Sequence, residues 1–424
     1  MYRLFSKKTN KKYDAIAIIL LFTIFFAVYC NFGSYKSNIE IKSLYISSPE
    51  KFQTPMSEKT SSADSEKTES IKHILIWTEK NLKPLINLGE GRTVFIEKKC
   101  EWNNCYVTGD RNLLGDYTEF EAIIFGGTQL YLLRYKNDLP KRRDPKQKYI
   151  YANLESAASY PVCTSVWNYF FNTSWTYRLD STLFWPYFII EDSNNIRVGP
   201  KKNIHWMNIS DMDPIDKDLK ATIGLKSKAA AWFVSNCNTM SLREHFVKQL
   251  EEQMHVYALE LDVYGDCGKL QCSQINMKGC ELMLQKNYYF YLAFENTFSE
   301  DYVTEKILHA LRHDTVPIVF GGANYTRFMP EGSYLNALEL GPHKLAQRMH
   351  ELIHNPEAYF LYFKWKKYYS YHFPHEKSET DAYCNFCEFL NTHESMKKKT
   401  VIEYFNIWWT PHVYCQDVHN ISIH

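Results

Sequence analysis

The chain has 424 residues, which suggests two or three domains, and its 49 Lys and Arg almost balance its 48 Asp and Glu. So balanced a chain lacks the concentrated basic surface that broad binding of nucleic acid requires. With 45% hydrophobic and 23% charged residues it can bury a full core, and it is not a multi-span membrane protein.

The amino-terminal segment predicts a single-pass membrane anchor. Residues 15–33 carry no charged side chain and follow a basic stretch at 1–14. The short apolar run suits the thin membranes of the early secretory pathway, and the basic flank predicts a cytosolic tail over 1–14 and a lumenal body. A cleaved signal peptide is the alternative, but no Ala-x-Ala site follows the run. Residues 34–70 are polar and mixed in charge, as in a flexible stem.

From residue 71 onward, short apolar runs alternate with amphipathic segments. Continuously apolar runs are typical of parallel strands covered on both faces, so the alternation predicts an α/β fold with right-handed crossovers. The predicted strands are His73–Trp77, Ala122–Phe125, Tyr149–Ala152, Ala229–Ser235, Val256–Val263, Tyr288–Phe294 and Val316–Phe320. The predicted helices are Ser241–Met254, Tyr302–His313, His343–His354 and Glu357–Tyr369, the first with Ser241 and Glu244 as a capping box.

A polar, strand-poor stretch divides this body. It runs from Asn203 to Lys228, so we expect two Rossmann-like, doubly wound domains over 71–215 and 216–375, followed by a cysteine-containing tail over 376–424. In open parallel sheets, ligands bind beyond the carboxyl ends of the strands. A functional site is therefore expected in the segments that follow each strand.

Cysteines and sequons agree with a secreted or lumenal body. Eleven cysteines are consistent with an oxidising compartment. The close pairs are better explained by disulfides than by zinc, because the second half of a zinc site is missing at normal spacing. The pairs are Cys100 with Cys105, Cys267 with Cys272, and Cys384 with Cys387. Sequons for N-glycosylation occur at Asn172, Asn208, Asn324 and Asn420.

The run Phe290–His313 holds the densest set of polar candidates. Glu295 and Asn296 follow an apolar strand, and Lys306 lies in the first turns of the next predicted helix. Free amides at a helix start attract anions, and a lysine adds a full positive charge there. Glu305 could accept hydrogen bonds from ribose hydroxyls. A capped surface helix with an exposed Glu–Lys pair is the structural alternative.

A second strand end carries Ser235 and Asn236, with Arg243 opening the next helix. Arginine binds phosphate through two parallel hydrogen bonds and stays protonated, so Arg243 and Lys306 could converge on one pyrophosphate. Phosphate-binding glycine loops of the NTPase and dinucleotide types are missing. Asp211-Met212-Asp213 has the Asp-x-Asp pattern of metal-dependent glycosyltransferases, but no apolar strand presents it.

These segments resemble the α-1,3-fucosyltransferases. The resemblance is carried by FYLAFENTFSEDYVTEK, KAAAWFVSNCNTMSLR, DVYGDCG and YIYANLESAASYP, and it covers most of 120–375. It implies a GT-B-type fold of two Rossmann-like domains on a single-pass type II anchor in the Golgi membrane. It also implies GDP-fucose as the donor, bound by the carboxyl-terminal domain, with the acceptor on the amino-terminal side. We expect no essential metal, with Mn²⁺ or Mg²⁺ at most as a stimulating ion.

Residue roles follow from the same resemblance. Glu155, in the N-L-E-S motif, is expected to take the acceptor proton in an inverting displacement; from the residues alone, Glu119, Asp180 and Asp192 are equal candidates. The resemblance places Arg243 and Lys306 on the pyrophosphate. The other donor-binding residues are expected to be Ser235, Asn236, Asn296, Tyr302 and Glu305. Acceptor-side or donor-positioning residues are expected to be Tyr177, Arg178 and Asp180.

Departures from the family pattern bear on the acceptor. Leu179 and Thr182 replace an Arg and an Asp, and the His-His motif of Lewis-type members is missing where Gly126 and Gly127 stand. The loop FGGANY after the last strand is shorter than in Lewis-type members. The missing motif, this short loop and the CNFC tail look more like members that fucosylate the GlcNAc of the N-glycan core. The alternatives are a Lewis-type enzyme acting on antennary N-acetyllactosamine and a non-catalytic glycan-binding Golgi glycoprotein. Family members form disulfides at corresponding ends, which favours two bonds among Cys100, Cys105, Cys384 and Cys387, either local or joining the two ends of the body.

Overall fold

The structure is a computed structural model that describes residues 70–130, 133, 138–272, 277–392, 396, 400–410 and 415. The expected cytosolic tail and anchor at 1–33, and all of the stem but its last residue, lie outside the described residues. Within the described ranges, no helix combines the length and apolar character that a bilayer crossing requires.

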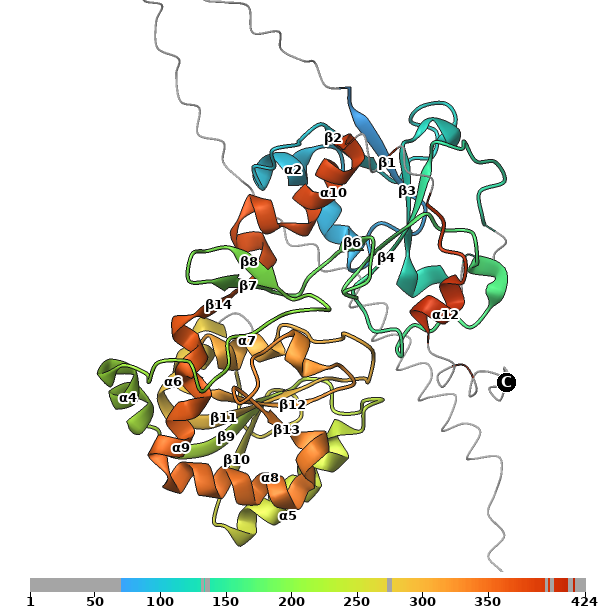
Figure 1. The fold of residues 1–424 in the computed structure, drawn as a ribbon. Coiled ribbons are helices and arrows are strands. Elements are labelled where there is room, and N and C mark those ends of the chain that lie inside the picture. Colours follow the sequence, from blue (N-terminus) through green and yellow to red (C-terminus); the bar gives the residue numbers. More distant parts are fainter. Residues whose placement is uncertain are drawn as a thin grey trace, which may run out of the picture. The chain divides into compact units, whose positions relative to one another are not determined.

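The first part of the described body is built on one parallel sheet (Figure 1). Its strand order is β2-β1-β3-β4-β5-β6, and every neighbouring pair runs parallel. The strands are β1 (Lys72–Ile76), β2 (Cys105–Thr108), β3 (Ala122–Gly126), β4 (Lys148–Asn153), β5 (Thr173–Thr176) and β6 (Leu183–Phe184). Side chains of β3 and β4 are buried along their whole length, which explains why their sequences are apolar on both faces.

Helices from distant parts of the chain cover both faces of this sheet. One face packs against α2 (Thr93–Glu97) and the carboxyl-terminal helix α10 (Ala382–Asn391). The other face packs against α12 (Phe405–Trp409), whose Phe405 and Trp409 rings contact Tyr151. The tail therefore completes the core of the first part.

A second parallel sheet forms the other part, with the order β10-β9-β11-β12-β13. Its strands are β9 (Lys228–Phe233), β10 (Leu261–Tyr264), β11 (Tyr288–Phe294), β12 (Val316–Phe320) and β13 (Leu335–Asn336). One face packs against α5 (Arg243–Val256) and α8 (Ala337–His354), and the other against α6 (Met277–Asn287) and α7 (Lys306–Leu311). Two doubly wound parallel sheets are the α/β arrangement that the apolar runs predict. Two further helices, α4 (Lys217–Gly224) and α9 (Pro356–Phe360), flank this part.

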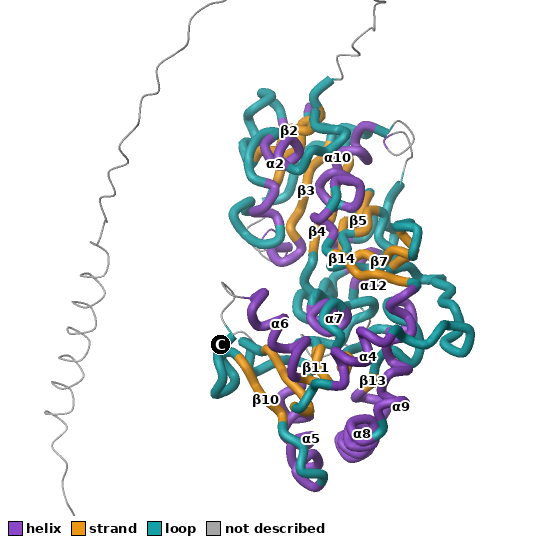
Figure 2. The backbone as a smooth tube through the Cα atoms, turned by 90° about the vertical axis from the view of Figure 1, so that its left-hand side faces the viewer, coloured by secondary structure: helices purple, strands orange, loops and turns teal. Residues whose placement is uncertain are grey.

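A small antiparallel sheet was not predicted from the sequence. Its order is β14-β7-β8, with β7 (Ile189–Asp192), β8 (Arg197–Gly199) and β14 (Tyr369–His372). The strands are short, and only part of each is buried, so they lack the apolar runs that mark the larger sheets. Figure 2 shows β14 and β7 beside one another, joining segments from far apart in the sequence.

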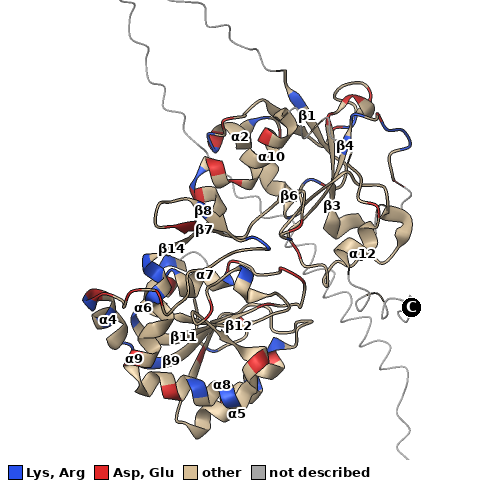
Figure 3. Cartoon of the chain, in the orientation of Figure 1, with Lys and Arg blue, Asp and Glu red and all other residues tan. Residues whose placement is uncertain are grey.

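Five disulfides link the described cysteines. Cys100 bonds to Cys384 and Cys105 to Cys387, so α10 is fastened to the first sheet by the pairing that joins the two ends of the body. The remaining bonds were not predicted: Cys163–Cys415, Cys237–Cys267 and Cys272–Cys280. The expected pairing of Cys267 with Cys272 is therefore wrong. Acidic and basic residues are interspersed over both parts of the body (Figure 3).

Several helix boundaries predicted from the sequence are wrong. The helix predicted to end at Tyr369 ends at Phe360, and Tyr369 opens the strand β14. The helix α5 starts at Arg243, after Leu242 in a left-handed conformation, so Ser241 is not its cap. Glu244 instead accepts hydrogen bonds from the amide and the hydroxyl of Thr239, at 3.1 and 2.9 Å. The predicted helix at Tyr302 begins only at Lys306, because Thr304 uses its amide and hydroxyl to bind the Glu295 carboxylate.

Candidate active site

Glu155 lies on the loop that follows β4, at the carboxyl edge of the first sheet. The side chain of Asn153, which is fully buried, accepts a hydrogen bond from the Glu155 amide at 3.0 Å. The Asn153 amide group donates in turn to the hydroxyl of Tyr151 at 3.1 Å. The hydroxyl of Tyr187 donates to the carbonyl of Leu154. Two side chains thus hold the peptide group that joins Leu154 to Glu155, one at its carbonyl and one at its amide.

The glycine at position 127 makes room for this support. A Cβ on Gly127 would lie 2.5 Å from the Tyr151 hydroxyl and 2.7 Å from the Asn153 Nδ2. Both distances are shorter than van der Waals contact allows, so any side chain at this position would displace the pair that holds Glu155. The absence of the His-His motif here therefore has a structural reason.

Charges from the second part of the chain act on the Glu155 carboxyl. Burial raises the pKa of Glu155 above its ordinary value of 4.5; the charges of Lys306 and Lys83 oppose that rise and Glu305 adds to it. A half-buried carboxylate with a raised pKa binds a proton more readily than an exposed one. This is a property of a general base.

Glu295, at the end of β11, organises the loop that carries Glu305 and Lys306. Its side chain is 1% exposed and accepts from the Thr304 amide at 2.8 Å and from the Lys306 Nζ at 2.9 Å. Burial lowers the pKa of Lys306, but the carboxylates of Glu295 and Glu305 outweigh this and raise it. Lys306 therefore keeps its charge, with 22% of its side chain exposed. The sequence places Glu295 at a strand end, but its pairing with Lys306 was not predicted.

Arg243 is held at the carboxyl ends of β9 and β11. Its guanidinium donates to the carbonyls of Phe294 and Asn236, at 2.5 and 3.1 Å, and the residue is 4% exposed. Within the described residues, the Arg243 Nε and the Asn296 Oδ1 are buried without a hydrogen-bond partner. Buried polar atoms normally have partners, so this edge of the sheet holds an unused donor and an unused acceptor.

The other residues predicted to bind the donor lie in two different environments. Ser235 and Asn236 are exposed on the loop after β9, which the Cys237–Cys267 disulfide ties to the loop after β10. Tyr302 is 3% exposed, and its ring packs against Tyr177 and Tyr187 at centroid distances of 5.0 and 6.1 Å. The ring of Tyr302 therefore joins the two parts of the body and has little free surface.

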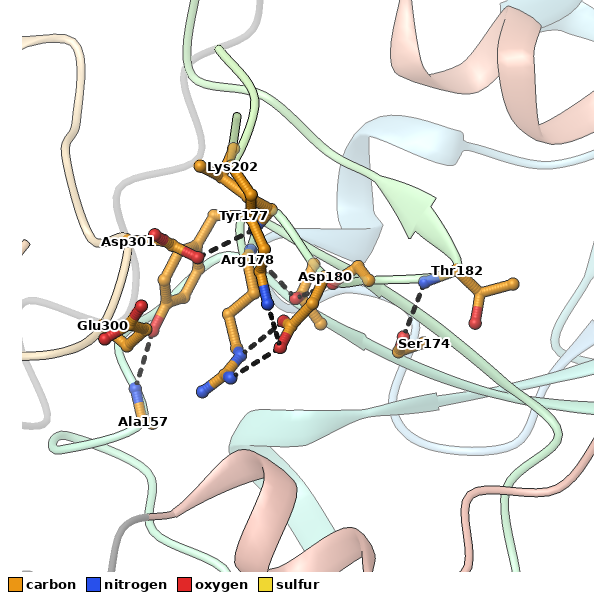
Figure 4. A network of polar contacts seen from close by, with 12 residues as sticks. Ala157, Ser174, Tyr177, Arg178, Asp180, Thr182, Lys202, Glu300 and Asp301 are labelled. Atoms are coloured by element: carbon orange, nitrogen blue, oxygen red, sulfur yellow. Dashed lines mark hydrogen bonds and ion pairs between the residues drawn. The ribbon is translucent and has the colours of Figure 1, made fainter. Parts of the chain in front are cut away.

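Tyr177, Arg178 and Asp180 belong to one polar network (Figure 4). The Tyr177 hydroxyl accepts a hydrogen bond from the Ala157 amide at 3.1 Å, two residues beyond Glu155. Arg178 binds both carboxylate oxygens of Asp180, at 2.9 and 3.0 Å, and the Lys202 Nζ donates to one of them. Burial alone would raise the pKa of Asp180, but Arg178 and Lys202 outweigh it and lower the pKa to about 2. Asp180 is thus a poor proton acceptor.

This network also connects the two parts of the body. The carboxylate of Asp301 accepts from the Leu179 amide at 3.2 Å. Close to it, the Ser299 hydroxyl accepts from the Ala158 amide at 3.1 Å, and the Thr297 hydroxyl donates to Ser156 at 2.6 Å. The loops after β4 and after β11 therefore bind one another, which brings Glu155 near Glu305 and Lys306.

The other carboxylates considered from the sequence lie elsewhere. Glu119 is exposed at the amino end of β3, and Asp192 accepts from the amides of Asn194 and Ile196 in the β7–β8 hairpin. Asp213 pairs with Lys367 and Tyr368. None of these three residues shares the surroundings of Glu155.

The sequons differ in accessibility. The Asn172 Nδ2 donates to the carbonyl of Thr400 at 2.7 Å, and its Oδ1 accepts from the Tyr149 amide. This side chain is a structural link, so the expected glycosylation of Asn172 conflicts with its contacts. Asn208 and Asn324 are exposed, and Asn420 lies outside the described residues.

Comparison with known proteins gives matches along most of the body. The family described as "Fucosyltransferase, N-terminal" matches residues 69–188, and "Glycosyltransferase family 10 (fucosyltransferase) C-term" matches residues 223–408. Alpha-(1,3)-fucosyltransferase C of Drosophila melanogaster is 32% identical over 350 residues, which are 80% of this chain and 78% of the relative. Glycoprotein 3-alpha-L-fucosyltransferase A of the same organism is 29% identical over 329 residues, 76% of this chain and 58% of the relative.

A crystal structure of an α1,3-fucosyltransferase with GDP-fucose aligns with 81% of this chain and 96% of its own, at a TM-score of 0.47 and 16% identity. The family matches together span both parallel sheets and the loops that carry Glu155, Arg243 and Lys306. With a relative that is 32% identical over most of its length, they show that the chain is an enzyme of glycosyltransferase family 10, the fucosyltransferases.

Proposed function

We propose that the chain transfers L-fucose from GDP-fucose to a GlcNAc hydroxyl of glycoprotein N-glycans, in α-1,3 linkage and with inversion. The observation that carries this proposal is the position of Glu155. It is a half-buried carboxylate with a raised pKa, fixed by Asn153 and placed among the charges of Glu305 and Lys306.

In the proposed reaction, Glu155 takes the proton from the acceptor hydroxyl. The hydroxyl oxygen then forms a bond to C1 of fucose on the face opposite the nucleotide, while the bond from C1 to the diphosphate oxygen breaks. GDP leaves with the bonding electron pair and gains negative charge. One displacement inverts the configuration at C1, and it requires one base on the acceptor side.

The donor site is proposed at the carboxyl edge of β9 and β11. Lys306 supplies a fixed positive charge, and the free Arg243 Nε and Asn296 Oδ1 offer a donor and an acceptor to the nucleotide sugar. Fixed cations stabilise a leaving diphosphate without reorganisation, so we propose that no metal is essential. Glu305, with 47% of its side chain exposed, remains available for the ribose hydroxyls.

For the acceptor, we propose the GlcNAc of the N-glycan core. The proposal is supported by Gly127, whose position leaves no room for the side chain that Lewis-type members carry there. Fucosylation of antennary N-acetyllactosamine is the second candidate. A glycopeptide with a free core and an N-acetyllactosamine oligosaccharide, offered in competition, distinguish the two by the product formed.

A lumenal location in the Golgi, behind a single amino-terminal anchor, completes the proposal. It is supported by the five disulfides among the described cysteines, because disulfides persist in oxidising compartments.

Glu155→Gln tests the catalytic assignment. The amide keeps the shape of the side chain but cannot accept the proton, so kcat should fall by about a hundredfold to ten-thousandfold while GDP binding is retained. Glu251→Gln is the matched control, because burial also raises the pKa of Glu251 but this residue lies on α5. Transfer rates within threefold of wild type in Glu155→Gln would assign the base to another group.

A further inference from the structure

A cavity of about 390 Å³ opens beside the proposed reaction centre. Its volume lies within the range of small-molecule sites, roughly 300–1,000 Å³. We call it the Phe373 cavity. Six of its lining residues carry the inference: Asn87, Tyr187, Glu305, Phe373, His375 and Tyr383. None of them except Glu305 was expected from the sequence to bind a ligand.

One wall of the cavity is shared with the surroundings of the proposed base. Tyr187 lines the cavity, and its hydroxyl holds the carbonyl of Leu154, next to Glu155. Glu305 also lines the cavity, and its charge acts on the Glu155 carboxyl. A molecule in the cavity would therefore lie next to the group that accepts the proton.

The walls combine aromatic rings with a few polar groups. Phe373 and Tyr383 face the cavity from the tail side, and Trp185 and Tyr187 from the segment after β6. Burial raises the pKa of Tyr383 to about 12, although its hydrogen bond to Asn87 acts in the opposite direction. The Tyr383 hydroxyl thus stays protonated and can serve as a hydrogen-bond donor or acceptor. Apolar rings with a small number of oriented polar groups suit a neutral, polyhydroxylated ligand.

The charges in the cavity disfavour the diphosphate of the donor. Lys98 is neutralised by Asp381, whose carboxylate lies 2.6 Å from its Nζ, and Glu305 adds a negative charge. The buried cation Arg243, which we assign to the diphosphate, is not among the lining residues. A sugar ring without charge is not repelled by this negative charge and needs no cation.

The cavity wall is also preorganised. Cys384, next to Tyr383, is bonded to Cys100, and Lys98 pairs with Asp381 at the cap of α10. The tail side of the wall is therefore fastened covalently to the first sheet, which reduces the entropy lost when a ligand binds.

We propose that the Phe373 cavity is an acceptor subsite, which holds a neutral sugar ring of the N-glycan next to the GlcNAc that receives fucose. This inference rests on the proposed function and extends it to the residues that recognise the acceptor.

The experiment compares Phe373→Ala with Phe360→Ala in steady-state kinetics, with GDP-fucose and an N-glycan glycopeptide. Phe360 is the matched control because it is also a partly buried phenylalanine with a cation over its ring. The Lys220 Nζ lies 5.0 Å from the centre of the Phe360 ring, and the Arg312 Cζ lies 5.2 Å from the centre of the Phe373 ring. Phe373→Ala should raise the acceptor KM at least tenfold and leave the donor KM within twofold. Phe360→Ala should change neither.

Two further variants keep the result interpretable. Phe373→Leu preserves most of the packing and removes the aromatic face, and Tyr383→Phe removes only the hydroxyl; each should raise the acceptor KM by a smaller factor. An unchanged acceptor KM in folded Phe373→Leu and Tyr383→Phe would overturn the inference. A raised donor KM would assign the cavity to the nucleotide instead. Failure of the wild-type enzyme to transfer fucose to any glycan would contradict the proposed function itself, which is a separate result.

Discussion

At the scale of single residues, Lys306 has two roles that one substitution cannot separate. Its Nζ neutralises Glu295, whose carboxylate is almost completely buried, and it is also our candidate for the diphosphate. Lys306→Ala should cost about 3 kcal/mol in the free energy of unfolding, because it leaves a buried charge without a partner. The same change should weaken GDP-fucose binding by about ten- to a hundredfold, the loss of one charged hydrogen bond.

The double variant Lys306→Ala/Glu295→Gln distinguishes the two roles. It removes the unpaired buried charge, so much of the stability should return in thermal unfolding. Donor affinity, measured by calorimetry, should stay low. Recovery of donor affinity together with stability would mean that Lys306 only supports the fold.

The contributions of Glu155 and Asp180 to folding stability should change with pH in opposite directions. Because the folded-state pKa of Glu155 is raised above 4.5, the folded protein holds that proton to higher pH than the unfolded chain does. Stability from this group is complete below pH 4.5 and is lost as the pH rises through the raised pKa. Glu155→Gln should therefore raise the melting temperature relative to wild type more at pH 7 than at pH 4.5.

The stability that Asp180 contributes changes with pH in the opposite direction. Its folded-state pKa is lowered to about 2 from an ordinary value of 3.8, so its contribution is present above pH 3.8 and is lost as the pH falls through 2. Asp180→Asn should lower the melting temperature at pH 7. Equal shifts for the two variants, with the same sign, would contradict the electrostatic assignment of both carboxyls.

At the scale of elements, the sequence predicted structure where local composition determines it. The strands β3, β4, β11 and β12 are buried along their length, so each appears as an apolar run. The residues that follow those strands were found for the same reason, since ligands of parallel sheets bind at strand ends. Such predictions need only a short window of sequence.

Elements that depend on distant contacts were missed. The strand β14 forms only by pairing with β7, about 180 residues earlier in the chain, and neither is a continuous apolar run. The expected capping box failed because Glu244 found a better partner in Thr239. Glu295 was recognised as an acidic residue directly after an apolar strand, but its pairing with Thr304 and Lys306 requires the loop to be folded. The Phe373 cavity combines six separate stretches of the chain, and no short sequence window contains it.

At the scale of the whole described body, the tail is joined to the first sheet by two neighbouring disulfides. Cys100–Cys384 and Cys105–Cys387 span 284 and 282 residues. Because Cys163–Cys415 already joins the tail to the first part, the first of these two bonds closes a ring of about 95 residues in the unfolded chain. In the chain-entropy model, closing this ring stabilises by about 5 kcal/mol. Once one bond is present, however, the other closes a ring of only about eight residues, which contributes roughly 2–3 kcal/mol.

The two bonds should therefore be strongly non-additive. Cys105→Ser/Cys387→Ser should lower the free energy of unfolding by about 2–3 kcal/mol, and removal of the Cys100–Cys384 bond alone by a similar amount. Removing all four cysteines should cost about 7–8 kcal/mol, because the ring of about 95 residues that Cys163–Cys415 leaves is then open in the unfolded state. Denaturant titration under non-reducing conditions measures all three variants. Additive losses would show that each bond acts through local packing of α10 and not by restricting the unfolded chain.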